Sequence, residues 1–156
     1  MDKIWAPWRK EYILLKKSKG CIFCLKRQSG LYDRKKYILK RDRYAFSMLN
    51  RYPYNNAHEM VSPYRHVGSL ELLNKKELLG LLNLVNYTKM RIDKLLRPHG
   101  YNIGMNLGKI AGAGFSGHVH IHIVPRWAGD TNFMPVISDT KIVSCSLEEM
   151  YNLLKG

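Results

Sequence analysis

Residues 118–127 read His-Val-His-Ile-His-Ile-Val-Pro-Arg-Trp, so that His118, His120 and His122 alternate with branched apolar residues. Valine and isoleucine favour β-strands, and a strand directs successive side chains to opposite faces. We therefore expect the three imidazoles on one face, about 6–7 Å apart, and the apolar residues between them on a core face. Because imidazole titrates near neutral pH, such a row on a buried strand indicates chemistry rather than packing.

The remainder of the chain predicts an α+β fold built on an antiparallel sheet. Strands are expected at four further places, namely Tyr37–Lys40, Arg43–Leu49, His58–Pro63 and Tyr101–Leu107. One long helix is expected over Asn74–Leu96, where apolar residues recur at helical spacing. These apolar residues, including Leu82 and Leu95, are expected in the core, and a short helical stretch is expected at Leu147–Leu154. Strands without a regular β-α-β alternation favour the α+β class.

The chain length of 156 residues suits a single domain, which we expect over residues 1–156, with an N-terminal arm at 1–20 and a C-terminal tail at 127–156. No apolar run approaches the roughly 20 residues of a membrane span, and the first residues lack the apolar core of a signal peptide. We therefore expect a cytoplasmic protein with no membrane partner. In that compartment the three cysteines are not expected to form structural disulfides.

The chain is strongly basic. It carries 26 lysine and arginine residues against 12 aspartate and glutamate residues, a formal net charge of +14. So large an excess attracts phosphate groups, carried either by nucleic acid or by a small, highly charged anion. The alternative is a solvated, lysine-rich surface, since the basic residues are spread along the chain.

A glycine-rich loop, Gly108–Gly117, directly precedes the histidine row. Glycine lets the backbone bring its N–H groups close to a ligand, and such loops form anion-binding nests. A loop of this kind beside histidines suits phosphoryl or nucleotidyl transfer, because imidazole attacks phosphorus and forms a covalent phosphoramidate. Zinc ligation by the alternating histidines is the rival interpretation.

The histidine row matches the His-φ-His-φ-His-φ-φ signature of the histidine-triad (HIT) superfamily, in which φ is an apolar residue. Six further segments resemble the bacterial diadenosine tetraphosphate phosphorylase branch of that superfamily: Trp5–Arg9, Cys21–Cys24, Asn50–Asn56, Pro63–His66, Val124–Trp127 and Gly129–Pro135. The resemblance covers most of the chain. It implies a five-stranded antiparallel sheet with one long helix and short helices, usually assembled as a homodimer.

The resemblance also implies roles for individual residues. The middle histidine, His120, takes the nucleotidyl group, and His122 and His118 support the nucleophile and the phosphates. Asn50 occupies the place of the family's ribose-binding acidic residue, where an amide both accepts and donates instead of only accepting. Asn106 matches a residue near the phosphates.

The loop and four other residues carry further expectations. The stretch Gly112-Ala113-Gly114-Phe115 stands where many relatives have polar side chains, so backbone amides are expected to hold more of the phosphate. Trp127 is expected to stack on the substrate or wall its site, the alternative being an aromatic side chain packed over the sheet edge. Cys145 is expected to be buried, and His58 and His99 are expected to be structural.

The pair Cys21-x-x-Cys24 indicates zinc or redox chemistry in a cytoplasmic protein. A redox pair normally lies in a thioredoxin-like β-α-β pattern, which is absent. We predict a structural zinc ion with His66 and His118 as the other two ligands, the set that the resemblance to zinc-holding HIT relatives implies. The other two histidines of the row then form the working pair. The alternative is two reduced, partly buried cysteines.

These features predict nucleotidyl transfer on dinucleoside polyphosphates. The first expectation is phosphorolysis of diadenosine tetraphosphate to ADP and ATP through an adenylyl-His120 intermediate, with inorganic phosphate as the acceptor. Hydrolysis of dinucleoside polyphosphates or of nucleoside phosphoramidates is the second interpretation. An interpretation of another class is a basic nucleic-acid-binding module whose triad is vestigial or holds only zinc. No recognised nucleic-acid motif supports it, so nucleic acid is not the expected partner.

Overall fold

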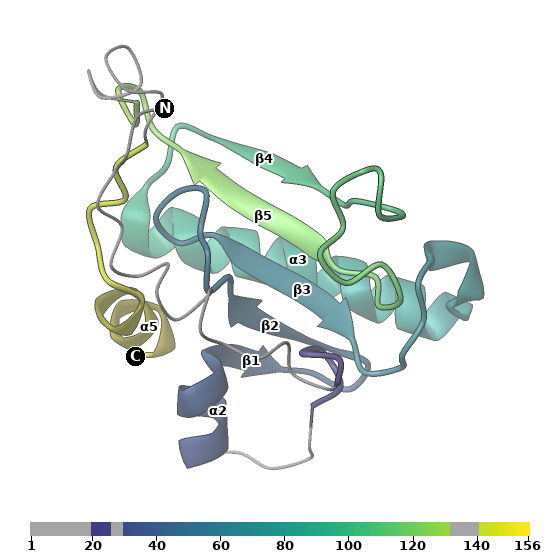
Figure 1. The fold of residues 1–156 in the computed structure, drawn as a ribbon. Coiled ribbons are helices and arrows are strands. Elements are labelled where there is room, and N and C mark those ends of the chain that lie inside the picture. The colour runs from purple at the N-terminus through teal and green to yellow at the C-terminus, as the bar shows by residue number, and fades with distance from the viewer. Residues whose placement is uncertain (1–19, 26–29, 132–140) are drawn as a thin grey trace.

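The structure of the protein, a computed structural model, describes residues 20–25, 30–131 and 141–156. Along the chain these residues form α2 (Leu31–Lys36), β1 (Ile38–Arg41), β2 (Ala45–Leu49), β3 (Glu59–Pro63), the 3-10 turn η1 (Leu70–Leu72), α3 (Lys75–Leu96), β4 (Gly100–Gly104), β5 (Ile121–Arg126) and α5 (Leu147–Lys155), as Figure 1 shows.

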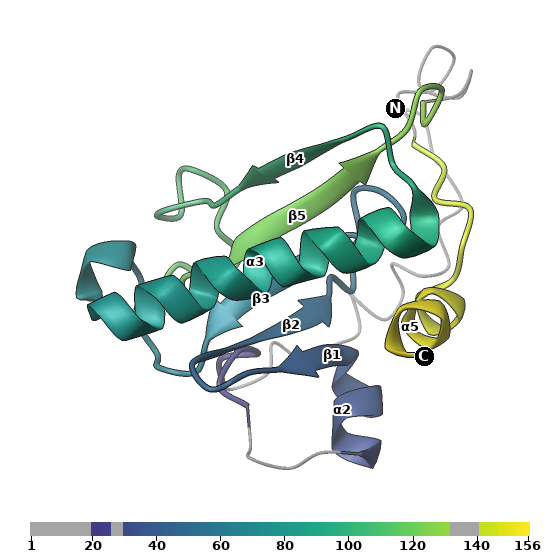
Figure 2. The same ribbon diagram turned by 180° about the vertical axis from the view of Figure 1, so that it is seen from behind.

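The strands form one sheet in the order β1-β2-β3-β5-β4, and every neighbouring pair is antiparallel. The long helix α3 crosses one face of this sheet, which Figure 2 shows from behind. Val61 of β3 and Ile121 and Ile123 of β5 pack there with Leu81 and Ile92 of α3 in the larger apolar core. The predicted α+β fold, with a five-stranded antiparallel sheet, one long helix and short helices, is therefore confirmed.

The long helix α3 begins with a capping box. Asn74 Oδ1 accepts from the Glu77 N–H at 3.0 Å, and the Glu77 carboxylate accepts from the Asn74 N–H at 2.9 Å. Its buried residues are Leu81, Leu84, Val85, Thr88 and Ile92. Leu82 and Leu95, which the helical spacing predicted in the core, are 47% and 42% exposed. The apolar stripe of this helix is wider than its contact with the sheet, so its edges face solvent.

The regular part of the histidine strand is shorter than the sequence predicted, since β5 begins only at Ile121. Before Ile121, two hydrogen bonds of side chains join this segment to β3. Ser62 Oγ donates to the Val119 carbonyl, and His118 Nε2 donates to the Pro63 carbonyl, both at 2.9 Å. Val119 and Ile121 are nevertheless each only 3% exposed. The predicted core face of the alternating run is therefore confirmed.

The short helix α2 was not predicted. It holds three consecutive basic residues and has no apolar periodicity that would reveal it. Its buried residue is Asp33, which forms an ion pair with Arg41 of β1 at 2.8 Å. An ion pair across eight positions thus ties this helix to the sheet edge, and such a contact leaves no periodic signal in the sequence.

The two ends of the chain are described in part. Residues 1–19 of the predicted arm and residues 132–140 of the predicted tail lie outside the described residues. The tail contains α5, which starts with a capping box at Ser146 and buries Met150, Tyr151 and Leu154. The division into one domain with an arm and a tail stays a prediction. None of the helices in the described segments combines the length and the apolar character needed to cross a membrane.

Candidate active site

The three histidines lie beside a second apolar cluster, on the sheet face away from α3. The buried members of that cluster are Phe23, Ile38, Phe46, Met48 and Met60. Phe23 joins it to the histidine row, because its ring centroid lies 4.5 Å from that of His120 and 5.5 Å from that of His118. The His120 and His122 ring centroids are 5.0 Å apart. The ring contacts run along one face, as the alternation predicts.

His120 carries its proton on Nδ1. That atom lies 2.9 Å from the His118 carbonyl oxygen, which only accepts, so the Nδ1–H group donates. The lone pair of the neutral ring is then on Nε2. His120 is 6% exposed, and burial lowers the pKa of its imidazole. A neutral ring with its lone pair on Nε2 is the form that attacks phosphorus.

His122 is hydrogen-bonded to a fourth histidine, His58, which lies directly before β3. The Tyr54 N–H donates to His58 Nδ1 at 3.1 Å, so the proton of neutral His58 is on Nε2. His58 Nε2 donates in turn to His122 Nδ1 at 2.9 Å. The proton of neutral His122 is therefore on its own Nε2, where it serves as a donor to a phosphate or a leaving group.

His58 is thus a site residue that the sequence analysis treated as structural. It has no alternating neighbour in the sequence, and 64 positions separate it from His122, so no local pattern marks it. Burial, with His122 and His120 nearby, lowers the pKa of His58 to about 3. Burial and His120 lower the pKa of His122 to about 4. Without a ligand these rings are neutral at pH 7, and a bound polyphosphate would favour the protonated form of His122.

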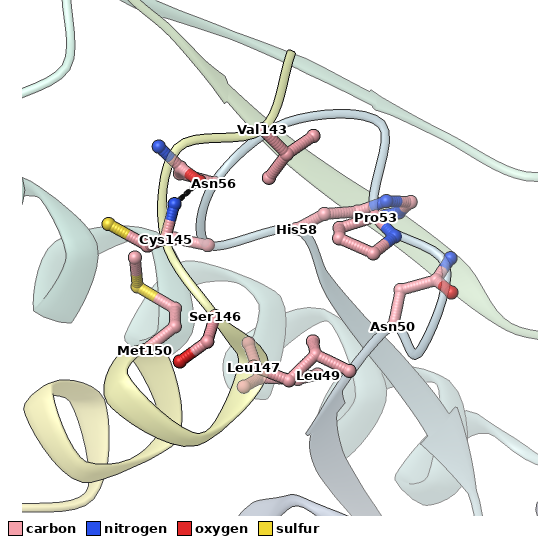
Figure 3. Close-up of a pocket in the computed structure, with 11 residues that line it drawn as sticks. Leu49, Asn50, Pro53, Asn56, His58, Val143, Cys145, Ser146, Leu147 and Met150 are labelled. Carbon is pink, nitrogen blue, oxygen red and sulfur yellow. Dashed lines mark hydrogen bonds between the residues drawn. The ribbon is translucent and has the colours of Figure 1, made fainter. Parts of the chain in front are cut away.

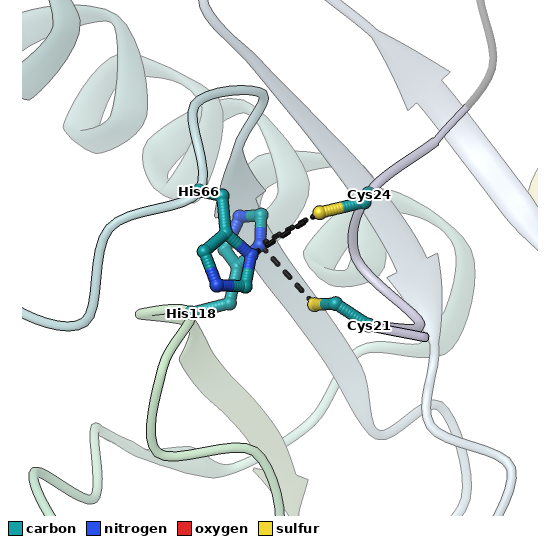
Figure 4. A group of neighbouring side chains, drawn as sticks. All are labelled: Cys21, Cys24, His66 and His118. Carbon is teal, nitrogen blue, oxygen red and sulfur yellow. Dashed lines mark hydrogen bonds between the residues drawn. The ribbon is translucent and has the colours of Figure 1, made fainter. Parts of the chain in front are cut away.

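The other end of the row belongs to a different cluster. Figure 4 shows Cys21, Cys24, His66 and His118 turned toward one another, with ligand atoms that all lie within 4.8 Å of each other. Cys21 Sγ lies 3.3 Å from His118 Nδ1, and Cys24 Sγ lies 3.2 Å from His66 Nδ1. Because His118 Nε2–H donates to the Pro63 carbonyl, its Nδ1 lone pair faces the sulfurs.

This cluster fits a zinc ion. Tetrahedral zinc with Zn–S bonds of about 2.3 Å and Zn–N bonds of about 2.0–2.1 Å places its sulfur and nitrogen ligands about 3.5 Å apart. The observed sulfur–nitrogen distances of 3.2, 3.3 and 3.8 Å bracket that value. Gly117, directly before His118, lies against the His66 ring, since a Cβ there would be 3.4 Å from His66 Nε2. The fold thus brings together all four predicted ligands, and two cysteines with two histidines form a closed, structural donor set.

The predicted ribose and phosphate residues lie on two different segments. Asn50 follows β2, its backbone N–H donates to the His58 carbonyl at 2.9 Å, and its Oδ1 accepts from the Tyr52 N–H at 2.9 Å. A ribose contact by Asn50 stays a prediction. Asn106 lies next to the glycine-rich loop, because a Cβ on Gly112 would be 3.6 Å from Asn106 Nδ2.

Two backbone N–H groups of the glycine-rich loop donate to carbonyls within the loop itself. The Gly112 N–H donates to the Lys109 carbonyl at 3.0 Å, and the Ala113 N–H donates to the Gly108 carbonyl at 3.3 Å. The Gly114 N–H has no acceptor among the described residues. Among the described residues of this loop, the Gly114 amide therefore keeps its donor capacity, whereas the amides of Gly112 and Ala113 are engaged within the loop.

Trp127 lies at the end of β5, where its contacts are with the long helix and a turn. Its Nε1–H donates to the Leu96 carbonyl at 3.1 Å, and its backbone N–H donates to Asp130 Oδ2 at 3.3 Å. These are contacts of an aromatic side chain packed beside the sheet. A substrate contact by Trp127 stays a prediction.

A small pocket lies beside His58, between the loop that joins β2 to β3 and the segment before α5 (Figure 3). Its volume of about 10 Å³ holds one water molecule and no nucleoside. This pocket is therefore too small to be the site of a nucleotide substrate, and His120 is not among the residues that line it. Cys145 lines this pocket, and its N–H donates to Asn56 Oδ1 at 3.3 Å. Cys145 is exposed, so the prediction that it is buried was wrong, because the tail crosses the surface there.

Comparisons with known proteins agree with this geometry. The HIT domain family matches residues 33–129, more than half of the chain. An AP-4-A phosphorylase of Mycobacterium tuberculosis (strain CDC 1551 / Oshkosh) is 34% identical over 161 residues, which cover 99% of this chain and 83% of that protein. The asymmetrical bis(5'-nucleosyl)-tetraphosphatase of Schizosaccharomyces pombe is 30% identical over 112 residues, which cover 72% of this chain and 58% of that protein.

A solved structure also resembles this chain in its fold. The crystal structure of a hypothetical histidine triad nucleotide-binding protein from Sulfolobus tokodaii strain 7 is similar with a TM-score of 0.65 and 26% identity, over 86% of this chain and 87% of that one. The predicted resemblance is confirmed, and so is the prediction of an enzyme of the nucleotidyltransferase or hydrolase type. The chain belongs to the histidine-triad (HIT) family.

Proposed function

We propose that the protein transfers nucleotidyl groups from dinucleoside polyphosphates, and that its main reaction is phosphorolysis of diadenosine tetraphosphate to ADP and ATP. The observation that carries this proposal is the hydrogen bond from His120 Nδ1 to the His118 carbonyl, which leaves the Nε2 lone pair as the nucleophile. Similarity to a protein named AP-4-A phosphorylase supports the choice of substrate and of phosphate as acceptor.

The reaction has two displacements at one phosphorus atom. In the first, the His120 Nε2 lone pair forms a bond to the α-phosphorus, the bond from that phosphorus to the bridging oxygen breaks, and ATP leaves with that oxygen. In the second, an oxygen of inorganic phosphate forms a bond to the same phosphorus and the P–N bond breaks. The products are ADP and the original His120. Each step conserves the charge and the atoms of its reactants.

Neighbouring residues assist both displacements. His122 Nε2–H donates to the phosphate oxygens, and the charge of a bound polyphosphate stabilises its protonated form. The Asn50 NH₂ group donates to the ribose. Asn106 and the Gly114 amide contact the phosphates, and the neighbouring amides of Gly112 and Ala113 belong to the same phosphate-binding loop. Preorganised donors of this kind stabilise charge that develops on transferring phosphoryl oxygens.

Zinc belongs to the proposal as a structural ion. Cys21, Cys24, His66 and His118 would hold it, and when bound it supplies only a crosslink between the Cys21–Cys24 turn, the end of β3 and the histidine row. His118 therefore acts through its backbone carbonyl, which keeps the proton of His120 on Nδ1. The thiols must stay reduced for this role, which supports a cytoplasmic location.

A homodimer is also proposed. The strand β4 lies at the edge of the sheet, and Ile103 on it is 45% exposed. Leu82 of α3 adds an exposed apolar side chain. An edge strand with an exposed apolar side chain supports pairing with a second copy of the chain.

The experiment that tests the reaction is product analysis with purified protein and diadenosine tetraphosphate, with and without inorganic phosphate. We expect equal amounts of ADP and ATP in the presence of phosphate and far slower turnover in its absence. AMP and ATP at the same rate in both conditions would instead establish a hydrolase, which the similarity to a tetraphosphatase favours as the second candidate. No turnover of the dinucleotide in either condition would contradict both.

A further inference from the structure

The nucleophile is in contact with an aromatic ring that the reaction does not use. The Phe23 and His120 ring centroids lie 4.5 Å apart with an interplanar angle of 24°, so the two rings are stacked. Phe23 is 1% exposed. Its ring therefore covers one face of the His120 imidazole completely enough that neither substrate nor water reaches that face.

Stacking and hydrogen bonding restrict different motions of His120. The bond from Nδ1 to the His118 carbonyl fixes one atom of the ring but still allows the ring to tilt about that bond. A flat aromatic surface at 4.5 Å opposes this tilt. The two contacts together fix the direction of the Nε2 lone pair, which must point along the line of displacement at phosphorus.

Phe23 is itself held at three sides. It lies inside the Cys21–Cys24 turn, which a bond from the Cys24 N–H to the Cys21 carbonyl closes at 3.3 Å. Phe115 meets its ring edge-on at a centroid distance of 6.2 Å and an angle of 86°. The remaining side packs into the cluster of Ile38, Phe46, Met48 and Met60. The ring is therefore a rigid surface rather than a mobile cover.

We infer that Phe23 is a positioning residue for His120, which connects the cysteine turn to the nucleophile. This inference rests on the proposed function, because it assigns to Phe23 an effect on attack by His120. The Cys21–Cys24 turn thus contacts His120 directly through the ring of Phe23, and Cys21 also contacts His118, whose carbonyl accepts from His120.

The test compares the same substitution at two members of one apolar cluster. Phe23→Leu removes the stacked ring, and Phe46→Leu removes an equally buried ring whose aromatic partner among the described residues is Tyr64, at 5.4 Å. Phe23→Met, whose unbranched and flexible side chain fills irregular gaps in a core, accompanies them so that a poorly folded leucine variant does not decide the result. Zinc content and thermal unfolding are measured for each variant.

We expect kcat to fall about tenfold to a hundredfold in Phe23→Leu and Phe23→Met, with KM changed less than about threefold, because a misdirected nucleophile binds substrate normally. Phe46→Leu is expected to keep kcat within about threefold of the wild type. Unchanged kcat in both Phe23 variants overturns the inference. Equal losses of kcat in Phe23→Leu and Phe46→Leu also overturn it, since they would show that only the packing of the cluster matters.

A second measurement does not depend on turnover. The imidazole proton signals of His120 in a nuclear magnetic resonance spectrum are shifted upfield by the stacked ring. They should move downfield in Phe23→Leu and stay in place in Phe46→Leu, while the His122 signals serve as an internal reference. If His120 signals do not move in Phe23→Leu, the inference fails even where the proposed reaction is confirmed. If the wild type turns over no dinucleotide, the proposed function fails, and the kinetic part of the inference fails with it.

Discussion

The two ends of the histidine row differ although they lie four positions apart on one segment. At the end that we call the cysteine end, His118 turns its Nδ1 to Cys21 Sγ at 3.3 Å and its Nε2 to a backbone carbonyl. At the other end, which we call the histidine end, His122 accepts from His58 Nε2 at 2.9 Å. His118 is fully buried, and His122 is partly exposed.

This difference shows that the strand supplies only positions, while distant segments decide the chemistry of each ring. A neutral imidazole has one donor and one acceptor nitrogen, and the partner of one nitrogen determines what the other does. The Pro63 carbonyl leaves the lone pair of His118 on Nδ1, the His118 carbonyl leaves the lone pair of His120 on Nε2, and the bond from His58 leaves the proton of neutral His122 on Nε2. These are the forms that the proposed ligand, nucleophile and donor require.

The largest expected effect is at the middle of the row. His120→Ala removes the only proposed nucleophile, so kcat for diadenosine tetraphosphate should fall about a thousandfold or more. Zinc content should not change, because His120 is not one of the four clustered ligands. Steady-state kinetics and metal analysis of the same preparation check both statements. A variant that keeps its turnover within a few-fold of the wild type would exclude covalent catalysis by His120.

The cysteine end should respond to substitution with lost stability. Cys24→Ser removes a sulfur ligand, so the protein should lose zinc, and its free energy of unfolding should fall by a few kcal/mol. The matched control is Cys145→Ser, because Cys145 is exposed and lies outside the cluster. Metal analysis and chemical denaturation measure the outcome. Equal stability and equal zinc content in Cys24→Ser and the wild type would contradict the proposal that zinc binds and stabilises the cysteine end.

The histidine end should respond with lost rate instead. His58→Gln breaks the relay that fixes the proton of His122, and we expect kcat to fall about tenfold while zinc stays bound. His99→Gln is the control, since His99 is exposed and its ring, within the described segments, accepts from the Ala128 N–H at 2.8 Å, far from His122 in the sequence. If both variants keep the wild-type kcat, His58 is structural, as the sequence alone suggested.

The smallest expected effect concerns pH and stability. His58 and His122 have pKa values of about 3 and about 4 in the folded protein, held down by burial. In the unfolded chain their pKa values are about 6.5, so below that pH the unfolded chain binds protons that the folded protein does not. The free energy of unfolding should therefore fall as the pH decreases from about 6.5 to about 4, by up to about 1.4 kcal/mol per pH unit for each histidine.

The measurement compares how much stability the wild type and the variant each lose between two pH values. Denaturation of the wild type and of His58→Gln at pH 7 and pH 5 cancels effects that the two proteins share, including any loss of metal. The wild type should lose more stability between these two pH values than the variant does. An equal loss in both proteins would show that His58 does not titrate as its burial indicates.

Much of this architecture could be predicted from the sequence, because the relevant signals are periodic. The alternation in residues 118–124 predicts the core face that Val119 and Ile121 occupy, and helical spacing predicts α3. At the cysteine end the Cys-x-x-Cys pair indicates a metal or redox site, and the resemblance to zinc-holding relatives implies His66 and His118 as the other two ligands. For the strand and the helix, neighbouring residues in the sequence carry the physical reason for the structure.

The remaining features depend on contacts between distant segments. The hydrogen bond between His58 and His122 spans 64 positions, and the ion pair between Arg34 of α2 and Glu148 of α5 spans 114. The stacking of Phe23 on His120 joins a turn near the start of the chain to a strand near its end. No local pattern encodes such pairs, so only the folded structure reveals them.

The division of labour along the row is tested most directly by locating the adenylyl group. The protein is mixed with diadenosine tetraphosphate without inorganic phosphate, quenched in base to preserve the phosphoramidate, digested, and analysed by mass spectrometry. The account predicts an adenylyl group on His120 and on no other histidine. An adenylyl group on His118 or His122, or none in a protein that turns over the dinucleotide, would contradict it.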